Sequence, residues 1–208
     1  MGLIFDIGAN MGAFAKAWRK ANEYTQVVCV EANPELIAPL EGLFYGDNNV
    51  TILNKLVSQR SGEKKDFYIN KNHVLSTAST GWMEQSRFCD TYSDCRTVQV
   101  ETITLDDLVA KYGEPAYIKI DVEGFEYDVL KGLNTRVGQI SFEFVEERIT
   151  EVIKCCKHLI NIGYTHFGYC FRDDYLEFPK VYTAFHEMDI MHKINVTGQS
   201  SWGNIYVK

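Results

Sequence analysis

A strand, a glycine-containing turn and a helix follow one another near the start of the chain, and this junction constrains the fold more than any other segment. The apolar run Leu3–Phe5 leads into Asp6–Gly12 (DIGANMG), and Phe14–Trp18 then places apolar residues at helical spacing. Such junctions lie at the carboxyl edge of open α/β sheets, where glycines let a ligand approach the backbone closely. We therefore expect a ligand site beside Gly8 and Gly12.

The residues of this turn favour S-adenosylmethionine over a dinucleotide. A dinucleotide-binding turn has the pattern G-x-G-x-x-G, whereas this chain has Asn10 at the middle glycine and closes one residue early at Gly12. Asp6 would repel a pyrophosphate but suits the ammonium group of a methionine moiety. Glu31, at the end of the next apolar run, can accept both hydroxyls of a ribose. The glycines alone would also fit a tight turn in another α/β protein. The residues assigned to cofactor binding are Asp6, Gly8, Ala9, Asn10, Gly12, Glu31, Asn54 and Asp121.

A second segment, Tyr117–Glu126 (YIKIDVEGFE), combines an apolar strand with a turn rich in carboxylates. Together with the first motif and with Thr104–Leu108 (TLDDL), it resembles the FkbM-type family of S-adenosylmethionine-dependent methyltransferases. The resemblance covers most of the chain, because Val28–Pro34, Val57–Gly62 and Ile140–Glu143 are similar to the family's second strand, the turn after its third strand and its fifth strand. It implies a Rossmann-like, doubly wound, seven-stranded sheet of the class I methyltransferase type, and O-methyl transfer.

The alternation of apolar strands with helical patterns also predicts a doubly wound α/β sheet. Lys55–Asn70 indicates an inserted hairpin with Ser61 and Gly62 between two strand-like runs, and the aperiodic stretch 70–96 is long enough to be a substrate lid. Its aromatic side chains either stack on a sugar or anchor the loop; they are Trp82, Phe88 and Tyr92. Strands are expected near 3–7, 26–31, 50–54, 116–120, 138–145, 164–171 and 202–207, and helices near 12–23, 34–45, 104–112, 124–131 and 149–161.

The length, charge and hydropathy of the chain indicate how many domains it forms, which partners are disfavoured and where the protein is located. A chain of 208 residues with 46% hydrophobic residues suits one enzyme domain over 1–208. The net charge of −7 disfavours nucleic acid as a partner. Since the chain has neither an apolar run of about 18 residues nor a signal peptide, we expect a cytoplasmic protein that does not enter membranes. Because the first strand starts within two residues of Met1, we also expect a piece of a larger protein, with a glycosyltransferase domain fused to it or associated with it.

The chemical step needs a group that orients the acceptor and removes its proton, and Asp121 follows the fourth strand where that group is expected. Glu123, Glu126 and Glu143 should lie near it, where crowded carboxylates raise one another's pKa or bind a divalent cation. Alternatively, Glu123 and Glu126 cap the following helix and pair with Lys119 or Lys131. The catalytic residues expected are Asp121, Glu123 and His73, the last a loop imidazole that is otherwise solvated surface. No metal ligand is assigned, because the six cysteines lack metal-site spacing.

Three functions follow from these observations. The resemblance implies an O-methyltransferase acting on a hydroxyl of a sugar, free or within a glycan. Methylation of an RNA ribose or cap uses the same fold and cofactor, although the acidic composition counts against it. A catalytically silent binding module is the third, and the intact motif residues argue against it.

Overall fold

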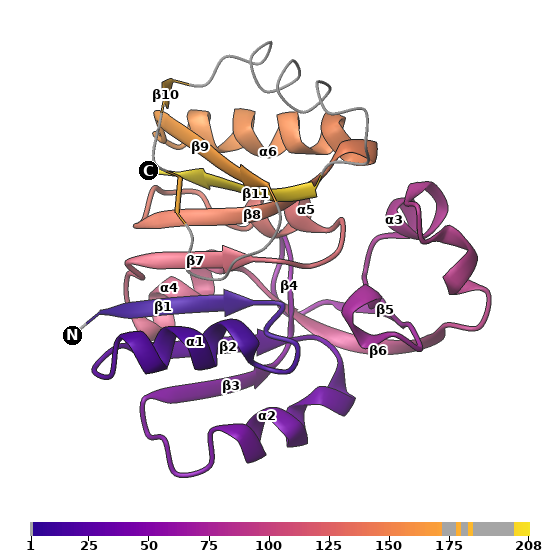
Figure 1. Cartoon of the computed structure of the whole chain (residues 1–208), viewed down its shortest axis with the longest axis horizontal. Coiled ribbons are helices and arrows are strands. Elements are labelled where there is room, and N and C mark those ends of the chain that lie inside the picture. The colour runs from indigo at the N-terminus through magenta and orange to yellow at the C-terminus, as the bar shows by residue number, and fades with distance from the viewer. Residues whose placement is uncertain (1, 172–177, 180–182, 185–201) are drawn as a thin grey trace.

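The computed structural model describes residues 2–171, 178–179, 183–184 and 202–208, and the strands of its main sheet lie one beside another from β3 to β10 (Figure 1). The strands are β1 (Leu3–Ile7), β2 (Gln26–Glu31), β3 (Val50–Asn54), β4 (Leu56–Val57), β5 (Lys64–Ile69), β6 (Arg96–Ile103), β7 (Tyr117–Ile120), β8 (Gln139–Val145), β9 (His166–Phe171), β10 (Thr183–Ala184) and β11 (Trp202–Val207). The α-helices are α1 (Ala13–Ala21), α2 (Ile37–Leu43), α3 (Thr80–Gln85), α4 (Leu105–Tyr112), α5 (Glu126–Leu130) and α6 (Ile149–Asn161), and short 3₁₀ helices are η1 (Pro34–Leu36), η2 (His73–Leu75), η3 (Cys89–Tyr92) and η4 (Glu146–Arg148).

The order of the main sheet is β10-β9-β11-β8-β7-β1-β2-β3. Strands β3, β2, β1, β7 and β8 run parallel, whereas β11 is antiparallel to both β8 and β9. The seven expected strands are all present, and the two-residue β10 extends the sheet at its β9 edge. The prediction of a doubly wound class I methyltransferase sheet is therefore confirmed.

The central strands are apolar because both of their faces are covered. All four residues of β7 are buried, and in β1 only Leu3 is partly exposed. Phe5, Ile118 and Ile140 from three adjacent strands are each 0% exposed and belong to one continuous core. Burial of this kind contributes about 1.5–3 kcal/mol for each large apolar side chain. The sheet therefore holds the carboxyl ends of β1, β2 and β7 in fixed positions.

The insertion between β3 and α4 contains an antiparallel hairpin, but its strands differ from those expected. β4 and β5, on either side of Ser61 and Gly62, do not pair with each other. Both pair with β6, β4 in parallel and β5 in antiparallel orientation, and the stretch 70–96 connects β5 to β6. The prediction of a hairpin within Lys55–Asn70 was therefore wrong. The antiparallel pair is formed by β5 and β6, and β6 lies outside that range. Figure 1 shows the insertion beyond the carboxyl ends of β1 and β7.

The stretch 70–96 folds around a small core of its own. Trp82 is 2% exposed, and its Nε1 donates a hydrogen bond to the hydroxyl of Tyr92 over 2.8 Å. That hydroxyl in turn donates to the carbonyl of Leu75 over 2.5 Å. Phe88 packs beside them, and Val145 at the end of β8 closes the cluster. Of the two roles expected for Trp82 and Tyr92, the structure therefore supports anchoring rather than stacking on a sugar.

No helix in the described part of the chain is both long and apolar enough to cross a bilayer.

Candidate active site

A cavity of about 270 Å³ opens at the carboxyl ends of β1, β2 and β7. The turn after β1, the end of β2, the turn after β7 and the insertion all contribute to its wall. Most of the residues expected at the site line it: Gly8, Ala9, Asn10, Glu31, His73, Asp121 and Glu123. Three of the residues assigned to cofactor binding, Asp6, Gly12 and Asn54, do not line it.

The carboxylate of Glu31 is held by the backbone of two neighbouring turns. Its Oε2 accepts the N–H of Asn10 and its Oε1 accepts the N–H of Asn33, each over 2.7 Å. Burial raises the pKa of Glu31 to about 7, although both backbone hydrogen bonds act in the opposite direction. A carboxylate oxygen has room for more than one hydrogen bond, so each can still accept a hydroxyl. The site therefore fits the ribose expected there.

The two glycines of the first turn are explained by packing within the chain. Gly8 has a φ of 77°, and a Cβ there would lie 1.9 Å from the carbonyl oxygen of Asp121. Gly12 has the same φ, and a Cβ there would lie 2.9 Å from Leu40 and 2.8 Å from Leu43, both in α2. Gly8 thus brings the turns after β1 and β7 together, and Gly12 lets α2 pack against the start of α1.

Asp6 lies behind the cavity rather than in its wall. Its side chain is 0% exposed, and its register partner in β7 is Lys119. The Nζ of Lys119 lies 3.9 Å from Asp6 Oδ1 and 2.9 Å from Asp121 Oδ2. Direct contact between Asp6 and a methionine ammonium group is therefore not what this geometry favours, because Lys119 lies between Asp6 and Asp121. Lys119 itself lines the cavity and was not assigned to the site, although it is the one charged residue in an otherwise apolar strand.

Asn54 supports β2 instead of facing the cavity. Its Nδ2 donates to the carbonyl oxygens of Glu31 and Ala32 over 2.9 and 3.2 Å. The neighbouring residues Lys55 and Leu56 line the cavity in its place. Asn54 is the last residue of β3, and its side chain is hydrogen-bonded to the backbone at the end of β2 and just after it.

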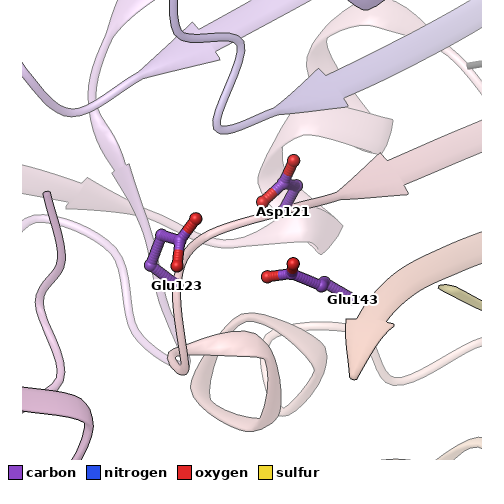
Figure 2. Close-up of side chains that lie close together, drawn as sticks. All are labelled: Asp121, Glu123 and Glu143. Carbon is purple, nitrogen blue, oxygen red and sulfur yellow. The ribbon is translucent and has the colours of Figure 1, made fainter. Parts of the chain in front are cut away.

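Three carboxylates converge beside the cavity (Figure 2). One oxygen from each of Asp121, Glu123 and Glu143 lies within 4.8 Å of the others. Burial raises the pKa of Glu123 and of Glu143 well above the usual value, and the negative charge of the neighbouring carboxylates raises both further. The expected proximity of Glu143 to Asp121 is confirmed. Such a group of carboxylates can share a proton or coordinate a divalent cation.

Glu126 stabilises the turn at the start of α5, which is the structural alternative considered for it from the sequence. Its Oε1 accepts the N–H groups of Gly124 and Val122 over 3.1 and 3.4 Å, in the turn before α5. Burial raises its pKa to about 7. It does not pair with either expected lysine, since Lys119 contacts Asp121 and Lys131 contacts Asp128. Glu126 therefore stabilises the turn that carries Glu123.

His73 is exposed in η2 and lines the cavity from the side of the insertion. The apolar part of the wall was not predicted from the sequence, because it combines β4, β5 and the turn before α5. It includes Leu56, Val57, Phe67 and Phe125.

Sequence comparison identifies relatives of this chain. Residues 6–188 match the family described as Methyltransferase FkbM domain. The hexuronic acid methyltransferase AglP of Haloferax volcanii is 28% identical over 152 residues, which cover 69% of this chain and 55% of AglP. The chain thus spans about half the length of this curated relative.

Comparison of structures finds the same fold in methyltransferases of low sequence identity. Precorrin-6y C5,15-methyltransferase from Geobacter metallireducens has a TM-score of 0.52 at 11% identity, with 99% of this chain and 79% of that chain covered. Fibrillarin from Aeropyrum pernix, in complex with natively bound S-adenosylmethionine, has a TM-score of 0.53 at 11% identity, with 100% and 66% covered. These structures share the fold of the chain, and the family match over residues 6–188 shows that the chain belongs to the FkbM methyltransferase family.

Proposed function

We propose that this enzyme transfers a methyl group to a hydroxyl of a sugar, either free or within a glycan. The observation that carries the proposal is a single cavity walled by Glu31 and by the carboxylates of Asp121 and Glu123, with Glu143 beside them. Carboxyl oxygens accept hydrogen bonds from hydroxyl groups, which suits a ligand rich in hydroxyls. The name of the relative AglP, a hexuronic acid methyltransferase, supports the same class of acceptor.

The cofactor supplies an activated methyl group on its sulfonium when it is bound, so the protein has to bind, orient and deprotonate the acceptor. Glu31 would hold the ribose hydroxyls of the cofactor. Asp121 would accept the proton of the acceptor hydroxyl, and its Oδ2 lies 2.9 Å from the Nζ of Lys119. Glu123 and Glu143 can accept hydrogen bonds from neighbouring hydroxyls of the same sugar.

The two other functions considered from the sequence have less support. Membership of a methyltransferase family favours an enzyme over a silent binding module. The fibrillarin likeness is one of fold alone, and the carboxyl groups of Asp121, Glu123 and Glu143 are not groups that bind the phosphates of an RNA.

A transfer assay with labelled S-adenosylmethionine tests the proposal. Separate panels should contain oligosaccharides, small polyols and capped RNA. Pairs of glycans that end in a hexose or in the corresponding hexuronic acid would show how an acceptor carboxylate affects transfer. We expect label in a carbohydrate, and label in RNA alone would contradict the proposal.

A further inference from the structure

The insertion is hydrogen-bonded directly to the turn that carries Glu123. Thr77 is 0% exposed, and its Oγ1 donates a hydrogen bond to the backbone carbonyl of Glu123 over 2.7 Å. The backbone of Thr77 is itself fixed to Tyr68 of β5, through N–H to carbonyl hydrogen bonds of 2.8 and 3.1 Å in the two directions. A continuous set of hydrogen bonds therefore connects β5 to the carboxylate-rich turn after β7.

Glu123 needs such support because of its backbone conformation. Its φ of 52° lies in the left-handed region, which glutamate adopts only when surrounding contacts favour it. On one side, Glu126 accepts the N–H groups of Val122 and Gly124. On the other side, Thr77 donates to the Glu123 carbonyl. The polar backbone groups of the turn are thus held from both sides.

The same turn is also covered by an apolar contact from the insertion. A Cβ at Gly124 would lie 2.8 Å from the Cβ of Trp82, so the indole side chain packs directly on this glycine. Trp82 is fixed in turn by its hydrogen bond to Tyr92. Stretch 70–96 therefore contacts the turn both through the Thr77 hydrogen bond and through the Trp82 side chain.

We propose that Thr77 is a positioning residue, which holds Glu123 in its left-handed conformation and so directs the Glu123 carboxylate toward Asp121 and Glu143. Thr77 does not line the cavity, so it acts through Glu123 and not through the cofactor. The inference rests on the proposed function, because it makes Glu123 part of the acceptor site.

Thr77→Val and Thr77→Ser form a matched pair that tests the hydrogen bond. Valine keeps the shape of threonine but cannot donate, whereas serine retains the hydroxyl. We expect Thr77→Val to lower kcat by about 10- to 100-fold through misplacement of Glu123. Binding of S-adenosylhomocysteine, measured by calorimetry, should change by less than about threefold, and Thr77→Ser should keep most of the wild-type kcat.

Ser79→Ala is the control for a general loosening of the insertion. Valine at position 77 also removes the acceptor of the Ser79 N–H, which donates to Thr77 Oγ1 over 2.9 Å. The side chain of Ser79 caps α3 by accepting the N–H of Trp82, and within the described part of the chain no hydrogen bond joins it to Glu123. Ser79→Ala should therefore lower Tm without lowering kcat. Equal losses of kcat in Ser79→Ala and Thr77→Val would overturn the inference.

Crystal structures of the wild type and of Thr77→Val with S-adenosylhomocysteine provide a readout that needs no acceptor. We expect the 122–124 turn to leave the left-handed conformation in the variant, and an unchanged turn would overturn the inference. A wild type that methylates no carbohydrate, combined with a rearranged turn in the variant, would reject the proposed function and support the positioning role. If Thr77→Val does not fold, Thr77→Cys is the substitute. Because a thiol donates hydrogen bonds only weakly, its kcat should lie below that of Thr77→Ser and above about one tenth of the wild-type value.

Discussion

Glu31 is the residue whose replacement should most directly affect cofactor binding. Its two oxygens already accept backbone N–H groups at 2.7 Å, so the carboxylate is oriented before any ligand arrives. Two ribose hydroxyls would add hydrogen bonds to a charged acceptor, each contributing about 1.5–3 kcal/mol. Loss of one to two such bonds in Glu31→Ala should raise the Kd for S-adenosylhomocysteine by about 10-fold to more than 100-fold.

The pH dependence of binding provides a second signature of the same contact. Burial raises the pKa of Glu31 to about 7, and hydroxyl donors favour the ionised form. Below that pH the free carboxyl is protonated, so binding must displace a proton. Affinity should therefore rise with pH up to about 7, by at most about tenfold per pH unit, and level off above it. Glu31→Gln has no ionisable group at this position and should lose this dependence.

Calorimetry with S-adenosylhomocysteine between pH 5.5 and 8 measures both effects. Glu41→Ala, at an exposed position in α2, is the matched control and should bind as the wild type does. Thermal denaturation must accompany the titrations, because Glu31→Ala also leaves two backbone N–H groups without their acceptor, at a cost of about 1–3 kcal/mol each. A folded Glu31→Ala variant with wild-type affinity would refute the role given to this carboxylate.

Three further predictions concern Asp121, Glu126 and the group of carboxylates formed by Asp121, Glu123 and Glu143. Asp121→Asn should reduce turnover by about 100-fold or more while the Kd for S-adenosylhomocysteine changes only a few-fold, and full turnover would remove Asp121 from the mechanism. The pKa of Glu126 rises from 4.5 to about 7 on folding, so the folded state binds more protons and the free energy of unfolding should fall as pH rises through that window, by roughly 3 kcal/mol at most. Denaturant titrations at pH 5 and 8 should show a smaller fall in Glu126→Gln, and an equal fall in both proteins would contradict this. Chelation with EDTA should leave activity intact if Asp121, Glu123 and Glu143 handle protons; loss of activity that magnesium restores would identify them as metal ligands.

The sequence predicted the parts of the site that depend on local pattern. Gly8, Asn10, Glu31 and Asp121 each lie at or just after the end of an apolar strand, and the carboxyl ends of neighbouring parallel strands meet at one edge of the sheet. This rule requires only that the strands be recognised and placed in order. The cavity was therefore predictable at the level of the strands that form it.

The features that the sequence did not predict depend on contacts between distant residues. The position of Asp6 behind Lys119 follows from the register of β1 with β7, which no local pattern specifies. In the insertion, β4 and β5 do not pair with each other, because each pairs with β6. Since β6 lies outside the range 55–70, the pattern within that range could not indicate which strands pair. Thr77 had no signal of its own, because its importance comes from one hydrogen bond to Glu123.

The central claim is methyl transfer to a carbohydrate hydroxyl at the carboxylates beside the cofactor cavity. Its most direct test is to incubate wild type and Asp121→Asn with S-adenosylmethionine and the best carbohydrate acceptor, and to locate the new methyl group by nuclear magnetic resonance. We predict an O-methyl ether at one sugar position with the wild type, and at least about 100-fold less product with Asp121→Asn at equal cofactor occupancy. A methyl group found on nitrogen or on RNA, or equal product from both proteins, would contradict the account.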